Sequence, residues 1–226
     1  MRPAAPVRLL RFLVLLAFVV AAGVSAPCVD ALAAGPNATV TFRKIFKSSY
    51  PEYVEIKVTD SGTGTFDIRQ LDEPSDPRTM RLDASVVRTI FELAAKLHNF
   101  DGVDLEMHRR IANLGEKTFS YQRDGESHQV TFNYTLNHDA MQLLATFEGL
   151  SRQQTDLADL ERTMRYDPLG VNDVLIQVQK DLDNKQIPDP PQFLALLDRL
   201  AADTHYIDIA RDRARTLAAR IRAGGT

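Results

Sequence analysis

Apolar and polar side chains alternate from residue 39 to residue 71, which is the pattern of β-strands with one buried and one solvent-facing side. The alternation falls into three runs, residues 40–46, 54–58 and 66–68. Asp60-Ser61-Gly62-Thr63-Gly64 separates the second run from the third, and glycines in such a position are typical of a hairpin turn. The pattern therefore predicts three antiparallel strands.

The following segment changes from a two-residue to a helical period. Pro74 and Pro77 interrupt residues 72–81, which we expect to form a surface connection. Asp83 is placed to cap the helix that follows, and this helix has a single apolar stripe. The stripe consists of Val86, Val87, Ile90, Leu93, Ala94 and Leu97.

A second hairpin and a long helical region are predicted after residue 116. Residues 117–123 and 129–135 form strands around Asp124-Gly125-Glu126-Ser127, and Asp-Gly between alternating runs is a strong hairpin signal. From Asn137 onward the apolar period is helical. This period fits either one long helix or two nearly collinear helices broken near Gly149.

Prolines divide the rest of the helical region, at Asp167-Pro168 and at Asp189-Pro190-Pro191. The predicted fold class is α+β: an antiparallel sheet of about five strands packed by helices, followed by an all-helical C-terminal region. We expect three parts, namely a signal peptide in residues 1–33, an α+β sheet domain in residues 38–152 and the helical region in residues 153–226.

The first 33 residues have the order of a secretory signal. Arginines at positions 2, 8 and 11 precede an uncharged run from Phe12 to Val29, and Ala31-Leu32-Ala33 offers small residues to a signal peptidase. We predict cleavage after Ala33, or alternatively after Ala34, and export to the periplasm or outside the cell. The alternative is an N-terminal membrane anchor, because the uncharged run approaches the roughly 20 residues that span a bilayer.

Charge and cysteine content narrow the possible chemistry. The chain has 27 basic and 30 acidic residues, and removing residues 1–33 leaves 24 basic and 29 acidic residues, a net charge of −5. This balance does not indicate a nucleic-acid partner. The single cysteine, Cys28, lies in the leader, so cleavage after Ala33 leaves a protein without disulfides or thiolate sites. A lipid anchor on Cys28 is disfavoured because Pro27 stands where such signals need a small, flexible residue.

Two parts of the chain resemble known families. Residues 38 to about 152 resemble an exported bacterial family of unknown function built as three strands, a helix, two strands and a helix. This resemblance is carried by Tyr50-Pro51-Glu52-Tyr53-Val54-Glu55-Ile56 and by Gly62 and Gly64, while Phe46 and Tyr50 stand where that family has two cysteines. It implies a fold and no activity. Phe193 to Ile221 is similar to one HEAT-type helix pair, with Ile209-Ala210-Arg211 and Ala214 to Leu217 on its second helix.

The densest group of candidate catalytic or metal-binding residues follows the first helix and consists of Asp101, Asp104, Glu106 and His108. Such a group can hold a cation or share a proton, as a metal-dependent or acid/base hydrolase requires. Its spacing matches no EF-hand loop or zinc signature, and solvated loop charges explain it better. The sequence also has no Gly-x-Ser-x-Gly nucleophile elbow and no phosphate loop. We therefore assign no catalytic residue and expect no cofactor.

The last predicted helix is locally basic, with Arg211, Arg213, Arg215, Arg220 and Arg222. Cations are common near helix C-termini, and weak contact with anionic lipid is an alternative role. Because strands, turns and helices account for most of the informative residues, we predict an exported, non-catalytic protein. It would bind a protein partner or envelope component through its exposed sheet face or its helical C-terminal region. The hydrolase described above is the alternative, and the sequence sets no oligomeric state.

Overall fold

The computed structural model describes residues 37–224, and the predicted signal peptide lies outside these residues. The strands are β1 (Thr39–Ile45), β2 (Tyr53–Thr59), β3 (Thr63–Arg69), β4 (Arg78–Arg81), β5 (Glu116–Arg123) and β6 (Glu126–Phe132). The helices are α1 (Ala84–Lys96), α2 (His138–Tyr166), α3 (Val171–Asp183), α4 (Leu194–Ala202) and α5 (Asp208–Arg222). Two short 3-10 helices, η1 (His98–Phe100) and η2 (Pro190–Phe193), complete the described elements.

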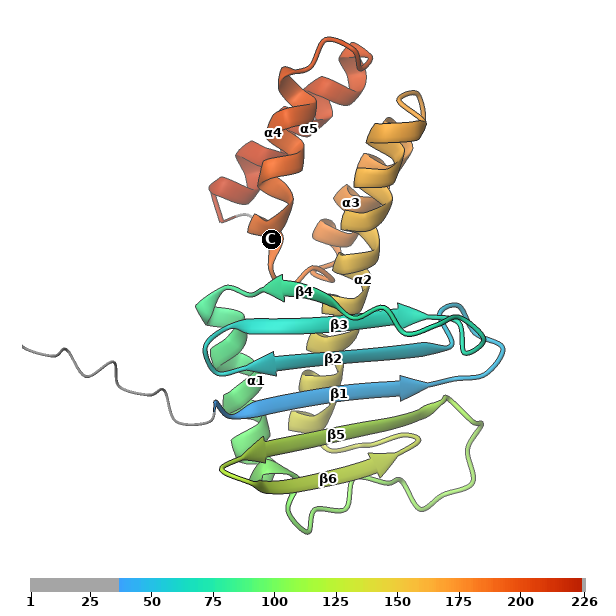
Figure 1. Cartoon of the computed structure of the whole chain (residues 1–226), viewed down its shortest axis with the longest axis vertical. Coiled ribbons are helices and arrows are strands. Elements are labelled where there is room, and N and C mark those ends of the chain that lie inside the picture. Colours follow the sequence, from blue (N-terminus) through green and yellow to red (C-terminus); the bar gives the residue numbers. More distant parts are fainter. Residues whose placement is uncertain (1–36, 225–226) are drawn as a thin grey trace, which may run out of the picture. The chain divides into compact units, whose positions relative to one another are not determined.

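The strands form one antiparallel sheet in the order β4-β3-β2-β1-β5-β6 (Figure 1). β1 lies inside the sheet because its inward side chains are apolar and meet apolar neighbours on both sides. In this register Phe42 stands between Ile56 of β2 and Phe119 of β5. The α+β class, the first three strands and both hairpins are thereby confirmed.

The sheet has a sixth strand, one more than the sequence indicates. β4 lies in the segment predicted to be a surface connection and pairs with β3, with Thr79 opposite Thr65. Met80 is the only buried residue among the four residues of this strand, so no apolar alternation marks it in the sequence. Pro77 directly before β4 has no backbone N–H, and proline is tolerated beside an edge strand.

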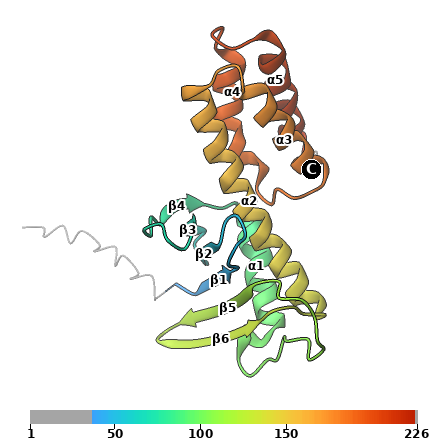
Figure 2. The ribbon, with the colours of Figure 1, turned by 90° about the vertical axis from the view of Figure 1, so that its right-hand side faces the viewer.

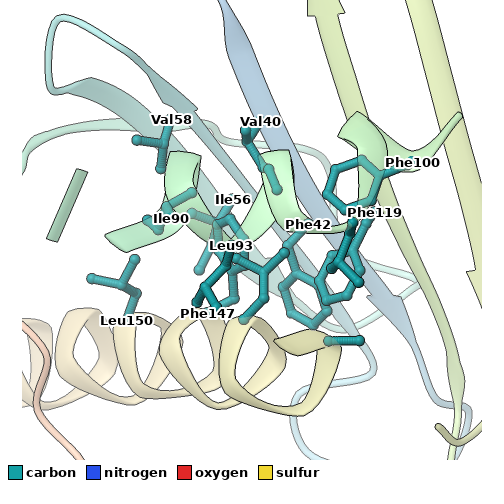
Figure 3. Packing of buried hydrophobic residues seen from close by; sticks show 14 of the residues in the cluster. Val40, Phe42, Ile56, Val58, Ile90, Leu93, Phe100, Phe119, Phe147 and Leu150 are labelled. Carbon is teal, nitrogen blue, oxygen red and sulfur yellow. The ribbon is translucent and has the colours of Figure 1, made fainter. Parts of the chain in front are cut away.

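α1 and the first half of α2 cover the same face of the sheet (Figures 1 and 2). Asp83 caps α1 as predicted, because its Oδ1 accepts the backbone N–H of Ser85 at 2.8 Å. The core between helices and sheet is rich in fully buried aromatic rings, and Figure 3 labels four of them, Phe42, Phe100, Phe119 and Phe147. The fully buried rings of this core belong to Phe42, Phe100, Phe119, Phe132 and Phe147.

α2 is one continuous helix of 29 residues, which decides between the two predicted alternatives. Gly149 does not break it. Instead, a Cβ on Gly149 would lie 2.8 Å from Cγ of Pro188, so this glycine allows the segment after α3 to approach α2 closely. The helix runs past β4 and leaves the sheet (Figure 1). It therefore crosses residue 152, where the sequence predicts the end of the sheet domain.

The second half of α2 packs with α3, α4 and α5 around a second core. Its fully buried members include Leu160, Leu175, Phe193 and Leu197. α2 ends at Tyr166, just before Asp167-Pro168, and Pro190 opens η2, so both proline segments interrupt the helices as expected. The prediction of an all-helical C-terminal region is confirmed.

Candidate binding groove

Asp101, Asp104, Glu106 and His108 form the alternative catalytic or metal site predicted from the sequence. The structure brings two of them, Asp104 and His108, into direct contact. Nε2 of His108 lies 2.7 Å from Oδ2 of Asp104, and both side chains are exposed. Their hydrogen bond raises the pKa of His108 and lowers the pKa of Asp104. The two groups stabilise each other's charged form as a surface ion pair.

The other two members of that group have separate partners. Glu106 accepts a hydrogen bond from the backbone N–H of Asn133 at 2.6 Å. Asp101 lies 3.4 Å from Nδ1 of His128 on β6. Within residues 37–224, no group of three or more His, Cys, Asp or Glu side chains is arranged to hold a metal ion. The hydrolase alternative stays a prediction.

The arginines of α5 are held by partners within the helical region. Four form ion pairs: Arg211–Asp208, Arg215–Asp212, Arg220–Asp183 and Arg222–Asp198. The fifth, Arg213, donates hydrogen bonds to Asn172 and Gln179 of α3. The positive charge of this helix is therefore largely balanced by the fold itself. Its contact with anionic lipid stays a prediction.

A different set of arginines faces an open groove between β4, the second half of α2 and α4. The groove consists of two cavities of about 660 and 690 Å³, which share Arg78, Ala158, Glu161 and Arg199 in their walls. We call it the arginine groove after the five arginines that line it, Arg78, Arg81, Arg162, Arg165 and Arg199. Cavities of this size suit the binding of a ligand or a peptide segment.

Most of these arginines carry an unbalanced charge. Arg162 pairs with Asp159 at 2.9 Å. In the part of the chain that the structure describes, the other four form no ion pair with a carboxylate: Arg78, Arg81, Arg165 and Arg199. Asp159 and Glu161 are the acids among the described residues lining the two cavities. The arginine groove is therefore positive, although the whole chain has a net charge of −3.

Neighbouring side chains position the guanidinium groups without neutralising them. The Arg78 guanidinium lies 5.3 Å from the centroid of the Phe66 ring, and that of Arg165 lies 5.9 Å from the centroid of Tyr166. Nη2 of Arg199 approaches Sδ of Met164 at 3.9 Å. Aromatic and thioether contacts leave N–H groups free, and a guanidinium fork fits a carboxylate or phosphate with two parallel hydrogen bonds.

A network of hydrogen bonds borders the arginine groove and joins the two cores. Oδ2 of the buried Asp189 accepts the backbone N–H of Asp83 at 2.9 Å and Nε2 of Gln192 at 2.7 Å. The N–H of Asp189 donates to Oε1 of Gln153 at 2.9 Å. Gln192 also donates to the carbonyl of Arg81 at 3.1 Å. The network thus connects the start of α1 with α2, η2 and the end of β4.

Replacing Asp189 by alanine is expected to lower the free energy of unfolding by about 2 kcal/mol, because it removes a buried acceptor of two hydrogen bonds. Urea unfolding measures this loss. The matched control is Asp198→Ala, which removes an exposed ion pair with Arg222 and should cost less than about 1 kcal/mol. Equal losses in the two variants would show that the network contributes no more than a surface ion pair.

A buried acidic pair lies between α2 and α3. Burial, and then the nearby charge of Asp181, raise the pKa of Asp156 to about 7. Oδ2 of Asp156 is buried and has no hydrogen-bond partner among the described residues. The carboxylate of Asp181, in contrast, has two polar partners. It accepts a hydrogen bond from Nε2 of Gln177 at 2.8 Å and lies 3.6 Å from Nη1 of Arg152. With a pKa of about 7, Asp156 is mostly protonated below neutral pH and ionises near pH 7.

Comparison with models of known protein families and with curated proteins found no match for this chain. The two family resemblances of the sequence therefore stay predictions. Among the described helices, none has both the length and the apolar character needed to cross a membrane.

The arginine groove cannot be recognised in the sequence, because the residues of its walls are far apart along the chain. Arg78 and Arg81 come from β4, Arg162 and Arg165 from α2, and Arg199 from α4. The available signal was the pair of arginines flanking Thr79-Met80, in a segment predicted to be a connection. The sequence predicts binding at the exposed sheet face or at the helical region. The outer edge of β4, which forms one wall of the groove, belongs to neither surface.

Proposed function

We propose that this protein is an exported, non-catalytic binding protein and that its arginine groove holds an acidic segment of a partner protein. The observation that carries the proposal is a set of four arginines that have no carboxylate partner among residues 37–224 and line open cavities, in a chain with a net charge of −3. Export is supported by the arginines at positions 2, 8 and 11 and the uncharged run that follows them, which have the order of a secretory signal. A guanidinium that the fold leaves unpaired is available to a carboxylate of another molecule.

The distribution of the arginines favours an extended ligand over a small anion. Arg165 lines only the first cavity and Arg81 only the second, while Arg78 and Arg199 line both. The positive groups are thus spread along the groove and do not converge on one point, as they would around a single phosphate. Apolar wall residues such as Ala158 and Leu196 add contact surface between the charges. A peptide with several acidic side chains matches this arrangement.

Binding of a fluorescently labelled glutamate-rich peptide to the purified protein tests the proposal by fluorescence anisotropy. We expect Arg78→Gln and Arg199→Gln each to weaken binding about fivefold, and the double variant to weaken it about 25-fold, because each removes a charge-assisted contact worth about 1 kcal/mol. Raising the salt concentration should weaken binding to the wild type as well, since these contacts are open to solvent.

The matched control is Arg222→Gln, which removes the same charge from an arginine that already pairs with Asp198 outside the groove. This variant should bind the peptide with nearly unchanged affinity. If it loses affinity as much as the groove variants do, binding reflects net charge and not the groove. If the wild type binds no acidic peptide at low salt, the proposed function is wrong.

A further inference from the structure

The outer edge of β4 has a hydrogen-bonding direction that follows from its pairing with β3. The backbone N–H of Leu82, just after the strand, donates to the carbonyl of Gly62 at 2.9 Å. Backbone groups alternate in direction along an antiparallel strand. Residues 78 and 80 therefore bond to β3 as Leu82 does, whereas the N–H and C=O groups of Thr79 and Arg81 point away from the sheet. The hydrogen bond from Gln192 to the carbonyl of Arg81 agrees with this direction.

Three backbone groups on this edge have no partner within residues 37–224. They are the N–H and C=O of Thr79 and the N–H of Arg81. Pro77, which has no N–H, precedes the edge, and Gln192 occupies the carbonyl of Arg81 at its other end. These three groups provide two donors and one acceptor. An added strand could use them to form a hydrogen-bonded residue pair with Thr79.

The arginine groove opens directly onto these three backbone groups. The cavity of about 690 Å³ is lined by Thr79 and Arg81 on one side and by α2 and α4 on the other, with Arg199 on α4. In Figure 1, β4 is the edge strand nearest to α4. The same cavity therefore offers unpaired backbone groups and unpaired guanidinium groups side by side.

Alternation determines which ligand side chains would meet the arginines. A ligand residue opposite Thr79 points its side chain to the open face of the sheet, as Thr79 does. The two ligand residues next to it point to the opposite face, on which Arg78 stacks over Phe66. Acidic side chains at these alternate positions would thus lie on the same face as Arg78, whereas Arg81, two residues after Thr79, points to the open face.

We infer that the arginine groove binds its acidic partner segment as an added β-strand, paired in backbone hydrogen bonds with Thr79 and Arg81 of β4. This inference rests on the proposed function and specifies its ligand. The occupant is an extended segment with acidic residues at alternate positions, and complementary charge selects it. Backbone pairing supplies affinity, and the arginines supply specificity for the acidic pattern.

A peptide of alternating glutamate and threonine provides the first test, with anisotropy as the readout. In the inferred pose the threonine N–H groups face β4 and the glutamate N–H groups face away. N-methylation of all threonines should weaken binding at least tenfold, and N-methylation of all glutamates should change it less than threefold. Equal effects of the two methylations would overturn the strand pairing.

Two variants of Thr79 provide the second test. Thr79→Pro removes an outward N–H and fixes φ at this residue, but it removes no N–H that bonds to β3, and it should weaken peptide binding about tenfold. Thr79→Val keeps the N–H and the side-chain shape and should bind like the wild type. Circular dichroism of both variants establishes that they fold. If folded Thr79→Pro binds normally, the strand pairing is wrong.

Competitors separate this inference from the proposed function. Inorganic polyphosphate or phosphatidylglycerol vesicles that displace the peptide, together with equal effects of both methylations, would show an anion site without strand addition. Loss of binding in Arg78→Gln with normal binding in Thr79→Pro would leave the proposed function intact and remove the strand. A dimer in sizing chromatography that Thr79→Pro dissociates would identify a second copy of this chain as the occupant and overturn the inference.

Discussion

Replacing Asp156 by asparagine is expected to stabilise the protein above pH 7, by on the order of 2–4 kcal/mol. Asp156 is buried beside Asp181, and its pKa rises from the ordinary 3.8 to about 7. Asparagine is neutral at every pH, has nearly the same shape and can donate a hydrogen bond in place of the carboxyl proton. It therefore removes the cost of ionising a buried carboxyl group.

The sign of the pH dependence follows from the direction of this shift. Below about pH 4 Asp156 is protonated in the folded and in the unfolded chain, and ionisation has no cost. Between about pH 4 and pH 7 the unfolded chain releases the proton while the folded protein keeps it, so the free energy of unfolding falls by about 1.4 kcal/mol per pH unit. Above about pH 7 the folded protein also releases the proton of Asp156. The stability that protonated Asp156 contributes is then fully lost.

Urea unfolding of wild type and Asp156→Asn from pH 4 to pH 8 measures this effect. The two proteins should be nearly equal in stability at pH 4 and should diverge as the pH rises. Asp159→Asn, on the same helix but half-exposed and paired with Arg162, is the control and should follow the wild type within about 0.5 kcal/mol. If Asp156→Asn and the wild type differ in stability by the same amount at pH 4 and at pH 8, the pKa of Asp156 is not raised in the folded protein.

Replacing Phe119 by alanine is expected to lower the free energy of unfolding by about 4 kcal/mol, because it removes a fully buried ring and leaves a cavity. The ring of Phe119 contacts three other aromatic rings of the first core. Its ring centroid lies 5.3 Å from that of Phe132, 5.5 Å from that of Phe100 and 5.7 Å from that of Phe42. These neighbours come from β6, η1 and β1, so filling the space would require several elements to move. Figure 3 shows Phe119 beside Phe42 and Phe100.

Urea unfolding at constant pH measures this loss. Phe119→Leu keeps part of the volume and should fall between the wild type and Phe119→Ala. Tyr50→Ala removes an aromatic ring of similar size that is 89% exposed, so it should change stability by less than about 0.5 kcal/mol. A loss below about 1 kcal/mol in Phe119→Ala would mean that the core repacks around the missing ring.

Local patterns in the sequence determined most secondary-structure elements of this protein. The alternation in β1, β2 and β3, the Asp-Gly turn after Arg123 and the Asp83 cap each depend on neighbouring residues only. Patterns of this kind can be read without knowing the rest of the chain. They were sufficient to predict the α+β class and the helical C-terminal region.

Tertiary structure decided the features that depend on distant partners. β4 is a strand because β3 supplies its hydrogen bonds, and its own four residues show too little alternation to predict it. α2 passes through Gly149 without a break, although the sequence alone allowed one, and this glycine instead accommodates the close approach of Pro188. Both features involve contacts between residues that are far apart in the sequence.

The same reason explains why the sequence did not predict the arginine groove. Whether an arginine is paired depends on which carboxylates the fold brings within reach. Arg222 of α5 lies beside Asp198 of α4, whereas Arg78 and Arg199 line the same open cavities and have no acid partner among the residues that the structure describes. Charge pairing, like the hydrogen bonds of an edge strand, is a property of three-dimensional neighbours, and only the folded chain determines it.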